Sequence, residues 1–335
     1  MQTRDPLTTL FAIRETGRPP LILAPMAGVT DAPFRALASR FGADLTVSEM
    51  IASQAMIRGI ARCLKQSASG DPETTLAVQI AGADPAAMAQ AARMQVDLGA
   101  EMIDINMGCP VRKIVGTGAG AALLRDESLA GRIMESVARA VSVPVTVKIR
   151  LGWDHHTRNG VTMARIAESA GMRAIAIHGR TRAQMYSGVA DWEAIGEIKS
   201  HIRIPVIGNG DITSPEQARE LWHKSGVDGL MIGRAALGRP WIFREIGHFL
   251  ATGQTLEPLP LSERGAVIVD HFHAMIAHHG PRTGHLLARK HLGWFTRGFP
   301  GGAAFRDRIN HAPHSEAALE MLDAFLDTTL ASRAA

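Results

Sequence analysis

Eight short apolar segments recur along this chain of 335 residues, and amphipathic helical segments separate most of them. Apolar runs that alternate with helices are typical of parallel strands buried on both faces of a sheet. Eight such units in about 230 residues predict a (β/α)8 barrel. An open doubly wound sheet is the alternative, but the Gly-x-Gly-x-x-Gly fingerprint expected after its first strand is absent. The predicted strands are Leu21–Ala24, Asp44–Ser48, Thr75–Ile80, Glu101–Ile105, Pro144–Lys148, Ala174–His178, Ile204–Gly208 and Gly229–Ile232.

Polar residues occur where most of these strands end. Because the functional side chains of a (β/α)8 barrel lie at the carboxyl ends of its strands, these residues are expected to meet on one rim. Each of them alone is better explained as a solvated strand terminus, but their convergence on one rim favours a functional site. They are Ala24-Pro25-Met26-Ala27-Gly28, Gln79, Asn106 with Cys109, Lys148-Ile149-Arg150, His178-Gly179-Arg180, Asn209-Gly210-Asp211 and Gly233-Arg234.

The segment from Asp104 to Pro110 interrupts an apolar run that is otherwise typical of a buried strand. Its Asn offers hydrogen-bond donors and acceptors, its Gly lets the backbone approach a ligand, and its Cys carries a proton that can be moved near neutral pH. The alternative is a tight turn that contains a buried thiol. The other cysteine, Cys63, lies in a segment with helical spacing and is expected to be a structural thiol.

The last two strand ends suggest a phosphate site. Barrels often bind phosphate with the loops after strands seven and eight, where Gly210 and Gly233 would permit a close backbone approach. Arg234 could add a charge-assisted contact, and Lys148 could place a fixed positive charge against the middle of a cofactor. A phosphate-bearing aromatic cofactor whose ring accumulates negative charge would suit both features, and reduced flavin mononucleotide (FMN) is such a molecule.

The composition is that of an ordinary globular protein, with 46% hydrophobic and 20% charged residues and a net charge of +4. Two cysteines cannot form a disulfide framework, and the start of the chain lacks the pattern of a signal peptide. No stretch is apolar enough to cross a bilayer. We therefore expect a cytoplasmic protein, a monomer, with no membrane or metal partner.

The C-terminal part of the chain differs from the rest. The segment Glu257-Pro258-Leu259-Pro260 predicts a linker between a barrel domain, residues 1–255, and a small all-helical domain, residues 261–335. Helical periodicity covers 262–279, 283–296 and 317–331. Six Arg or Lys residues lie between Arg282 and Arg308 against a single acid. Basic residues interleaved with aromatic ones could bind a nucleic acid, although a solvated face above a packed core explains the composition equally well.

Six motifs in this order resemble those of the tRNA-dihydrouridine synthases, and the chain is most similar to their bacterial B-type branch. The resemblance spans Pro20 to Phe305. It implies a barrel that binds FMN, a helical tRNA-binding domain, and reduction of the C5–C6 bond of selected tRNA uridines with NADPH as the electron source. The motifs are Ala24-Pro25-Met26-Ala27-Gly28-Val29-Thr30-Asp31, Asn106-Met107-Gly108-Cys109-Pro110, Val147-Lys148-Ile149-Arg150, His178-Gly179-Arg180-Thr181-Arg182, Asn209-Gly210-Asp211 and Gly233-Arg234-Ala235.

The resemblance also implies roles for individual residues. The flavin would be lined by Pro25, Met26 and Ala27, hydrogen-bonded through its ring by Gln79 and Lys148, and held at its phosphate by Asn209, Gly210, Asp211, Gly233 and Arg234. The target uracil would be held by Asn106, and Arg180 or His178 would also reach it or the flavin. Arg150, at its strand end, is a further candidate for the substrate. For the tRNA, the cluster of basic residues in the helical domain, rather than the resemblance, makes Arg289 and Lys290 the candidates. One departure is the apolar, glycine-rich segment Ile114–Gly120, where the family tends to place polar or basic residues.

Reduction of uracil requires a hydride at C6 and a proton at C5. Cys109 is the expected proton donor because a free thiol is mostly protonated at neutral pH. The base must also leave its stack, which costs least in irregular regions of a folded RNA. Two alternatives remain: a flavin barrel that acts on a free pyrimidine, as the dihydroorotate and dihydropyrimidine dehydrogenases do, and an RNA-binding protein without activity.

Overall fold

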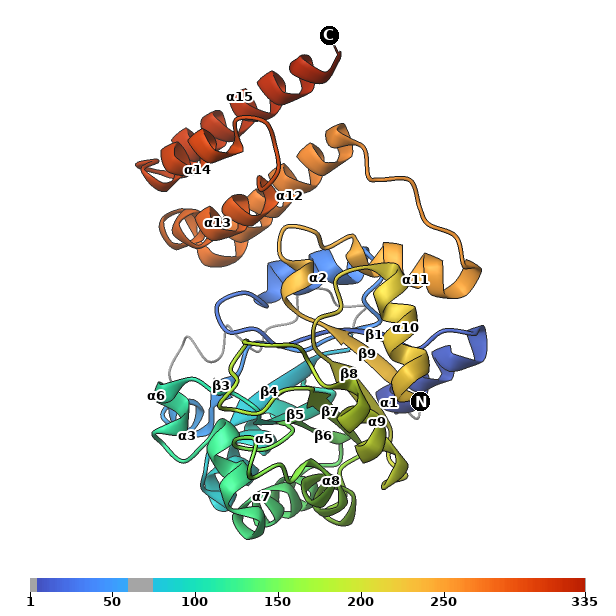
Figure 1. Cartoon of the computed structure of the whole chain (residues 1–335). Coiled ribbons are helices and arrows are strands. Elements are labelled where there is room, and N and C mark those ends of the chain that lie inside the picture. The colour runs from blue at the N-terminus through green and yellow to red at the C-terminus, as the bar shows by residue number, and fades with distance from the viewer. Residues whose placement is uncertain (1–4, 60–74, 335) are drawn as a thin grey trace.

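The computed structural model describes residues 5–59 and 75–334 (Figure 1). Within these residues, nine parallel strands form one sheet in the order β2-β1-β9-β8-β7-β6-β5-β4-β3. A parallel bridge between Val47, directly after β2, and Ala77, the first residue of β4, closes the sheet into a barrel. The (β/α)8 prediction is confirmed. The strands are β1 (Leu21–Leu23), β2 (Leu45–Thr46), β3 (Ile51–Ala52), β4 (Ala77–Ala81), β5 (Met102–Met107), β6 (Val145–Arg150), β7 (Ala174–His178), β8 (Val206–Asn209) and β9 (Gly229–Ile232).

The second predicted strand, Asp44–Ser48, is interrupted and continues further than expected. Its first part, β2, pairs with β1, and its second part, β3, pairs with β4. Between them the Ser48 hydroxyl accepts the backbone N–H of Gln79 at 3.1 Å. The Glu49 carboxylate accepts the backbone N–H of Gly28, in the loop after β1. The interruption therefore directs a buried carboxylate to the rim of the barrel.

Helices cover the outside of the barrel and begin at the residues that favour helix starts. Side chains of Asp31, Asp84, Asp126, Asp191 and Ser214 each accept the backbone N–H three residues later, which satisfies a free donor of the first turn. These five N-caps fix where the loops before their helices end. The surrounding helices are α2 (Ala32–Arg40), α3 (Ser53–Ile57), α5 (Pro85–Asp97), α6 (Arg112–Val115), α7 (Glu127–Ala140), α8 (Gly160–Ser169), α9 (Trp192–Ser200), α10 (Pro215–Ser225) and α11 (Ile242–Thr252).

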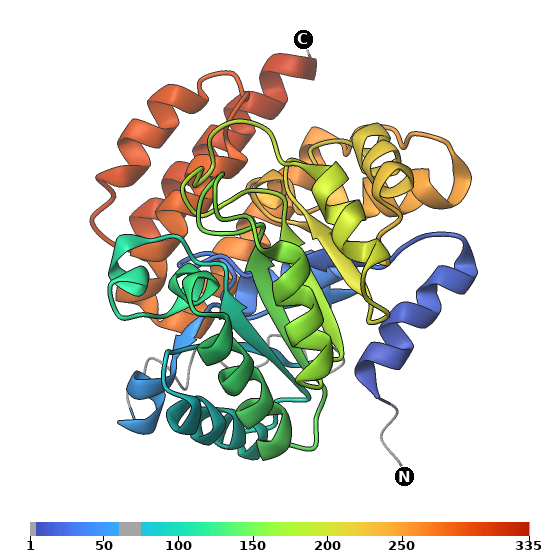
Figure 2. The same ribbon diagram turned by 60° about the horizontal axis from the view of Figure 1, so that its bottom comes forward.

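The apolar core has an outer and an inner layer. Outward-facing strand residues pack under the helices, and inward-facing ones such as Ile22 and Ile207 fill the barrel. The inner layer is completed by α1 (Pro6–Ala12), whose Leu7 and Leu10 pack against it. In Figure 2, α1 lies away from the C-terminal helices. The amino-terminal end of the barrel is thus filled with side chains, which leaves the opposite end for a ligand.

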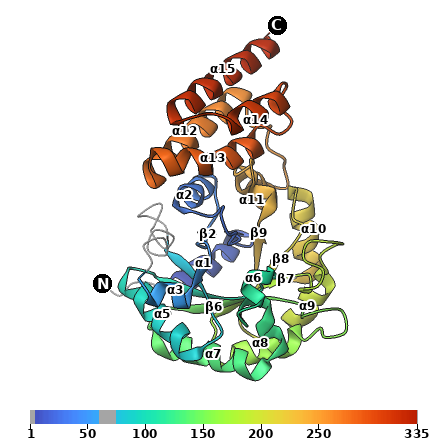
Figure 3. The ribbon, with the colours of Figure 1, turned by 90° about the vertical axis from the view of Figure 1, so that its left-hand side faces the viewer.

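A C-terminal helical region consists of α12 (Leu261–His279), α13 (Pro281–Phe295), α14 (Gly302–Asn310) and α15 (Ser315–Ala334). Three of these helices match the predicted periodicities, and α14 was not predicted. The core of the region, with Phe272 and Phe305, also includes Leu37 of α2 and Trp241. In Figures 1 and 3, α2 lies between the barrel and these helices. The helical region is therefore packed on the barrel through α2.

Two further sequence predictions concern Cys63 and membrane-spanning segments. Cys63 falls outside the described residues. Among the helices of the described part of the chain, none has the length and apolar character needed to span a bilayer.

Candidate active site

A cavity of about 780 Å³ opens at the carboxyl ends of the strands. Its volume lies within the range of ordinary ligand sites. Most of the residues predicted to form one rim line it, although they come from strands far apart in sequence. They are Pro25, Met26, Ala27, Gln79, Asn106, Cys109, Lys148, Arg150, His178, Asn209, Gly210, Asp211, Gly233 and Arg234.

The alternation of side chains along each strand explains this convergence. Successive strand residues point to opposite faces, so every second residue enters the barrel. On β6 the inward residues include Lys148 and Arg150, while Val147 and Ile149 pack under the helices. Strand pairing then sets neighbours: Lys148 lies beside Asn106 of β5, and Arg150 lies beside His178 of β7.

A buried hydrogen-bond network lies beneath the cavity. The Gln79 amide N–H donates to Asp104 at 2.6 Å, and the Asn106 amide donates to the Gln79 carbonyl oxygen at 2.8 Å. Thr146 donates to the other Asp104 oxygen at 2.6 Å. Burial raises the pKa of Asp104, while these donors oppose that shift. The network fixes which way the Gln79 and Asn106 amides face, and each keeps one N–H free for a ligand.

Cys109 is held by the same network. The Asn106 side-chain oxygen accepts the backbone N–H of Cys109 at 2.9 Å and that of Gly108 at 3.3 Å. The Cys109 thiol is half-buried and lines the cavity. The backbone of the loop after β5 is therefore fixed relative to Asn106, which places an amide donor and a thiol together.

Lys148 supplies a cation to the same cavity. Its ammonium group donates to the Asn209 side-chain oxygen at 3.0 Å, and the Asn209 amide donates to the Met231 carbonyl at 2.8 Å. Burial and the neighbouring Arg150 guanidinium lower the pKa of Lys148 to about 8. Lys148 is therefore mainly charged at neutral pH and titrates not far above it.

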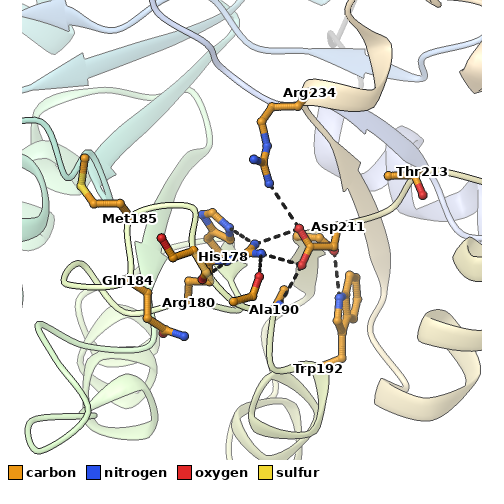
Figure 4. A network of polar contacts seen from close by, with 12 residues as sticks. His178, Arg180, Gln184, Met185, Ala190, Trp192, Asp211, Thr213 and Arg234 are labelled. Carbon is orange, nitrogen blue, oxygen red and sulfur yellow. Dashed lines mark hydrogen bonds and ion pairs between the residues drawn. The ribbon is translucent and has the colours of Figure 1, made fainter.

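Arg180 organises the loops after β7 and β8. Only 2% of this residue is exposed, and its guanidinium donates to both oxygens of Asp211, at 2.9 and 2.7 Å. It also donates to the Ser187 and Gly188 carbonyls. Figure 4 shows the Arg180 guanidinium directed at Asp211, with Arg234 approaching the same carboxylate. Arg180 does not line the cavity, so its contacts are those of a residue that positions loops.

Arg150 already donates to backbone carbonyls, whereas His178 can offer a ligand a neutral imidazole. Arg150 is also 2% exposed and donates to the Gly108, Thr181 and Met185 carbonyls, which ties the loop after β5 to the loop after β7. Burial lowers the pKa of His178 far below its usual value, and the surrounding cations lower it further. The His178 imidazole is therefore neutral and can accept or donate a hydrogen bond without a charge.

The loops after β8 and β9 form the proposed phosphate side of the cavity. Gly210 has a φ of 136°, and a Cβ added there would lie 2.5 Å from the Ala190 Cβ. Asp211 has a positive φ of 56°, which is uncommon for a residue with a side chain. Its carboxylate is already paired with arginines, so any phosphate contact would come from its backbone N–H. Arg234, half-exposed, remains the cation nearest to solvent.

Comparison with known proteins identifies the family. The family profile described as dihydrouridine synthase (Dus) matches residues 22–330. The chain belongs to the dihydrouridine synthase family. It is 50% identical to tRNA-dihydrouridine synthase B of Pseudomonas aeruginosa over 89% of this chain and 90% of that protein. It is also 50% identical to tRNA-dihydrouridine synthase B of Xanthomonas campestris, over 93% and 94%. The resemblance to this family predicted from the motifs is confirmed.

A comparison with solved structures bears on the fold alone. Histamine dehydrogenase from Rhizobium sp. 4-9 superimposes with a TM-score of 0.52 at 13% sequence identity. The match covers 76% of this chain and about half, 49%, of that one.

The segment in which this family member departs from the expected pattern, Ile114–Gly120, packs against the loop that carries Cys109. The backbone N–H of Ala121 donates to the Cys109 carbonyl at 3.0 Å. A Cβ on Gly120, whose φ is 62°, would lie 2.8 Å from that carbonyl oxygen. Glycine at this position therefore permits the close approach that supports Cys109 from behind.

Tyr186 is a cavity residue that the sequence patterns did not single out. It is 53% exposed, in the loop after β7, and its ring lies under the Arg234 guanidinium at 4.8 Å and near Arg150 at 5.7 Å. Cation–π contacts of this kind hold an aromatic ring at a polar rim. The available signal was that it is the chain's single Tyr.

Arg289 and Lys290, predicted to contact tRNA, do not line the cavity and have partners within the chain. The Arg289 guanidinium donates to His285 at 2.9 Å and to the Ala312 carbonyl at 2.5 Å. The Lys290 ammonium donates to the carbonyl of Gly28, in the loop after β1. Within the described residues, no group of three or more His, Cys, Asp or Glu side chains is placed to hold a metal ion.

Proposed function

We propose that this protein is a tRNA-dihydrouridine synthase that uses FMN and NADPH to reduce the C5–C6 bond of uridine in tRNA. One observation carries the proposal: Cys109, Asn106 and Lys148 line one cavity, in a chain about 50% identical to proteins named tRNA-dihydrouridine synthase B over most of its length. A proton donor, an amide and a cation are what reduction of a uracil ring needs beside a hydride source.

The cavity suits FMN in both shape and chemistry. The loop with Pro25, Met26 and Ala27 forms one wall, and Gln79 and Lys148 present donors from the strands. Backbone N–H groups near Gly210 and Gly233, together with Arg234 and the loop carrying Asn209, would hold the phosphate. Bound FMN, once reduced by NADPH, would supply the hydride that uracil C6 receives.

The residues around the substrate divide the remaining work. The free N–H of Asn106 would hold a uracil carbonyl, with neutral His178 as a further partner. The Cys109 S–H bond would break as its proton passes to C5, and the thiolate would regain a proton from solvent. Arg150 and Arg180 would position the loops that surround the base, because carbonyl groups already use their donors.

We further propose residues 1–255 as the catalytic domain and residues 261–335 as the tRNA-binding domain, acting in the cytoplasm. Several basic side chains of the helical region are exposed, including Arg282, Arg297 and Arg308. Exposed cations can contact phosphates without losing an internal partner. These residues are therefore better candidates for RNA contacts than Arg289 and Lys290.

The direct test is product formation. The purified protein, loaded with FMN and supplied with NADPH, should form dihydrouridine in unmodified tRNA, detected by mass spectrometry of digested nucleosides. Free uridine and UMP serve as the comparison substrates. Reduction of the free pyrimidines but not of tRNA would contradict the proposed substrate, and no reduction of any of them by a flavin-loaded protein would contradict the activity.

A second prediction concerns pH and FMN binding. The pKa of Lys148 is lowered to about 8, so its ammonium is lost as pH rises through that value. A charged donor binds an acceptor more strongly than a neutral amine does. The affinity of the apoprotein for FMN should therefore fall about fivefold between pH 7 and pH 9, measured by fluorescence quenching. Lys148→Met should bind more weakly at pH 7 and show little change with pH. A parent protein whose affinity for FMN stays constant over this pH range would refute the assignment of Lys148 as a charged donor to FMN.

A further inference from the structure

The loop after β1, residues 24–31, forms a wall of the cavity. Ala24, Pro25, Met26, Ala27 and Val29 all line it. Gly28 has a φ of 74°, a left-handed conformation that favours glycine. Because this wall consists of backbone and small side chains, its shape depends on what holds the backbone in place.

The barrel holds one side of the loop. The Met26 backbone N–H donates to the Thr30 hydroxyl at 3.0 Å, and Arg35, on α2, donates to the Thr30 carbonyl at 2.8 Å. The Gly28 N–H donates to the carboxylate of Glu49, between β2 and β3. These contacts fix the ends and one face of the turn.

The C-terminal helical region holds the other side. From α13, the Lys290 ammonium donates to the Gly28 carbonyl, and a Cβ on Gly28 would lie 3.4 Å from the Lys290 nitrogen. From α12, His279 contacts the Asp31 carboxylate at 2.7 Å. Asp31 also caps α2 through the Phe34 N–H at 3.1 Å. Two adjacent helices, more than two hundred residues along the chain, thus contact one short loop. Figure 3 shows α13 next to α2, the helix that follows this loop.

The interface behind these contacts is well packed. The Phe34 ring meets His271 and His291 edge to face, with centroids 5.9 and 5.5 Å apart. Both imidazoles are almost fully buried and contact each other at 3.1 Å. Interiors packed in this way transmit displacement rather than absorb it. A change in the position of α13 would therefore reach the loop.

We propose that Lys290 and His279 are positioning residues that hold the cofactor loop from the helical region, and that Lys290 is not an RNA phosphate contact. The proposal rests on the function proposed above, in which this loop lines FMN. It gives the helical region a second role, since its attachment to the barrel sets the shape of the cofactor site as well as the place of the RNA.

The test separates these two roles with variants of one helix. Lys290→Met removes the donor and keeps a long side chain, and Arg282→Met removes an exposed cation from the start of the same helix. Apoprotein is titrated with FMN, and tRNA binding is measured across a salt series. Lys290→Met should weaken FMN binding about tenfold, because the loop loses a charged hydrogen bond, and should leave the salt slope unchanged. Arg282→Met should leave FMN binding unchanged and flatten the slope by about one unit.

Further variants and a stability measurement keep the outcome clear. His279→Leu should also weaken FMN binding, whereas Lys290→Arg, which retains a donor, should restore most of the affinity. Thermal unfolding of each apoprotein shows whether a loss of affinity merely follows a loss of fold. Unchanged FMN affinity in Lys290→Met, or a salt slope flattened as in Arg282→Met, would overturn the inference. A parent that binds no FMN would remove the proposed function itself, and the inference with it.

Discussion

Replacing Cys109 with Ala should lower the rate of dihydrouridine formation by about 10²–10⁴-fold, the usual cost of losing a positioned general acid. FMN affinity and tRNA affinity should stay close to those of the parent, because the contacts that hold this loop use the backbone of Cys109 and not its sulfur. The effect should therefore fall on kcat and leave KM nearly unchanged. Single-turnover reaction of the reduced, tRNA-bound enzyme would measure it without interference from NADPH.

Two controls define the role of the Cys109 thiol. Cys63→Ala should react at the parental rate, since that residue has no place in the predicted site. Cys109→Ser replaces the thiol with a hydroxyl, which is a much weaker acid, so its rate should lie nearer to that of the alanine variant than to that of the parent. A Cys109→Ala enzyme that forms product at the parental rate would assign the proton to another group or to water.

The barrel was predictable because its strands are short continuous apolar runs, a pattern that burial on both faces requires. The second strand was predicted only in part. It resumes at Ile51 and Ala52 after Ser48 and Glu49, which sequence alone presents as ordinary polar residues. The helix α1 was not predicted. Its seven residues carry too few periodic positions to distinguish a helix from an irregular N-terminal segment.

The cavity residues could be predicted in type and place, but not in what they already contact. Strand-end position brought Lys148, Asn106 and Arg180 to one rim. Whether an arginine there faces a ligand or the protein depends on loops that have no periodic pattern. Arg180 and Arg150 face backbone carbonyls of such loops, and Tyr186 enters the cavity from one of them.

In the helical region, too, the sequence does not show which groups a side chain contacts, and here the partners lie further apart along the chain. Clustered basic residues predicted RNA contacts for Arg289 and Lys290, because composition records charge without recording partners. Lys290 contacts a carbonyl 262 residues earlier in the chain, and Arg289 contacts the Ala312 carbonyl, just beyond α14, a helix that was not predicted. Exposure in the folded chain is what makes Arg282 and Arg308 the better candidates.

Replacing Arg180 with Met should reduce the free energy of unfolding by about 3 kcal/mol, toward the lower end of the cost of breaking a buried ion pair. The change leaves the Ser187 and Gly188 carbonyls without their donor. Asp211 keeps the backbone N–H of Ala190, at 2.8 Å, and the longer contact to Arg234, at 3.2 Å. The loss would be a large fraction of the 5–15 kcal/mol that typically stabilises a folded protein. Urea unfolding followed by circular dichroism would measure it.

The matched control is Arg158→Met, which removes an ion pair with Asp191 in which both side chains are well exposed. Water screens that pair, so its loss should cost less than about 1 kcal/mol. Arg180→Lys keeps the charge but offers a point donor in place of a planar fork, and it should recover only part of the stability. Equal stabilities of the Arg180→Met and Arg158→Met variants would mean that the loops after β7 and β8 hold their shape without this cation. If Arg180→Met is less stable than Arg158→Met, the buried Arg180 also sets the turn at Gly210. The folded Arg180→Met protein should then bind FMN more weakly than the parent does.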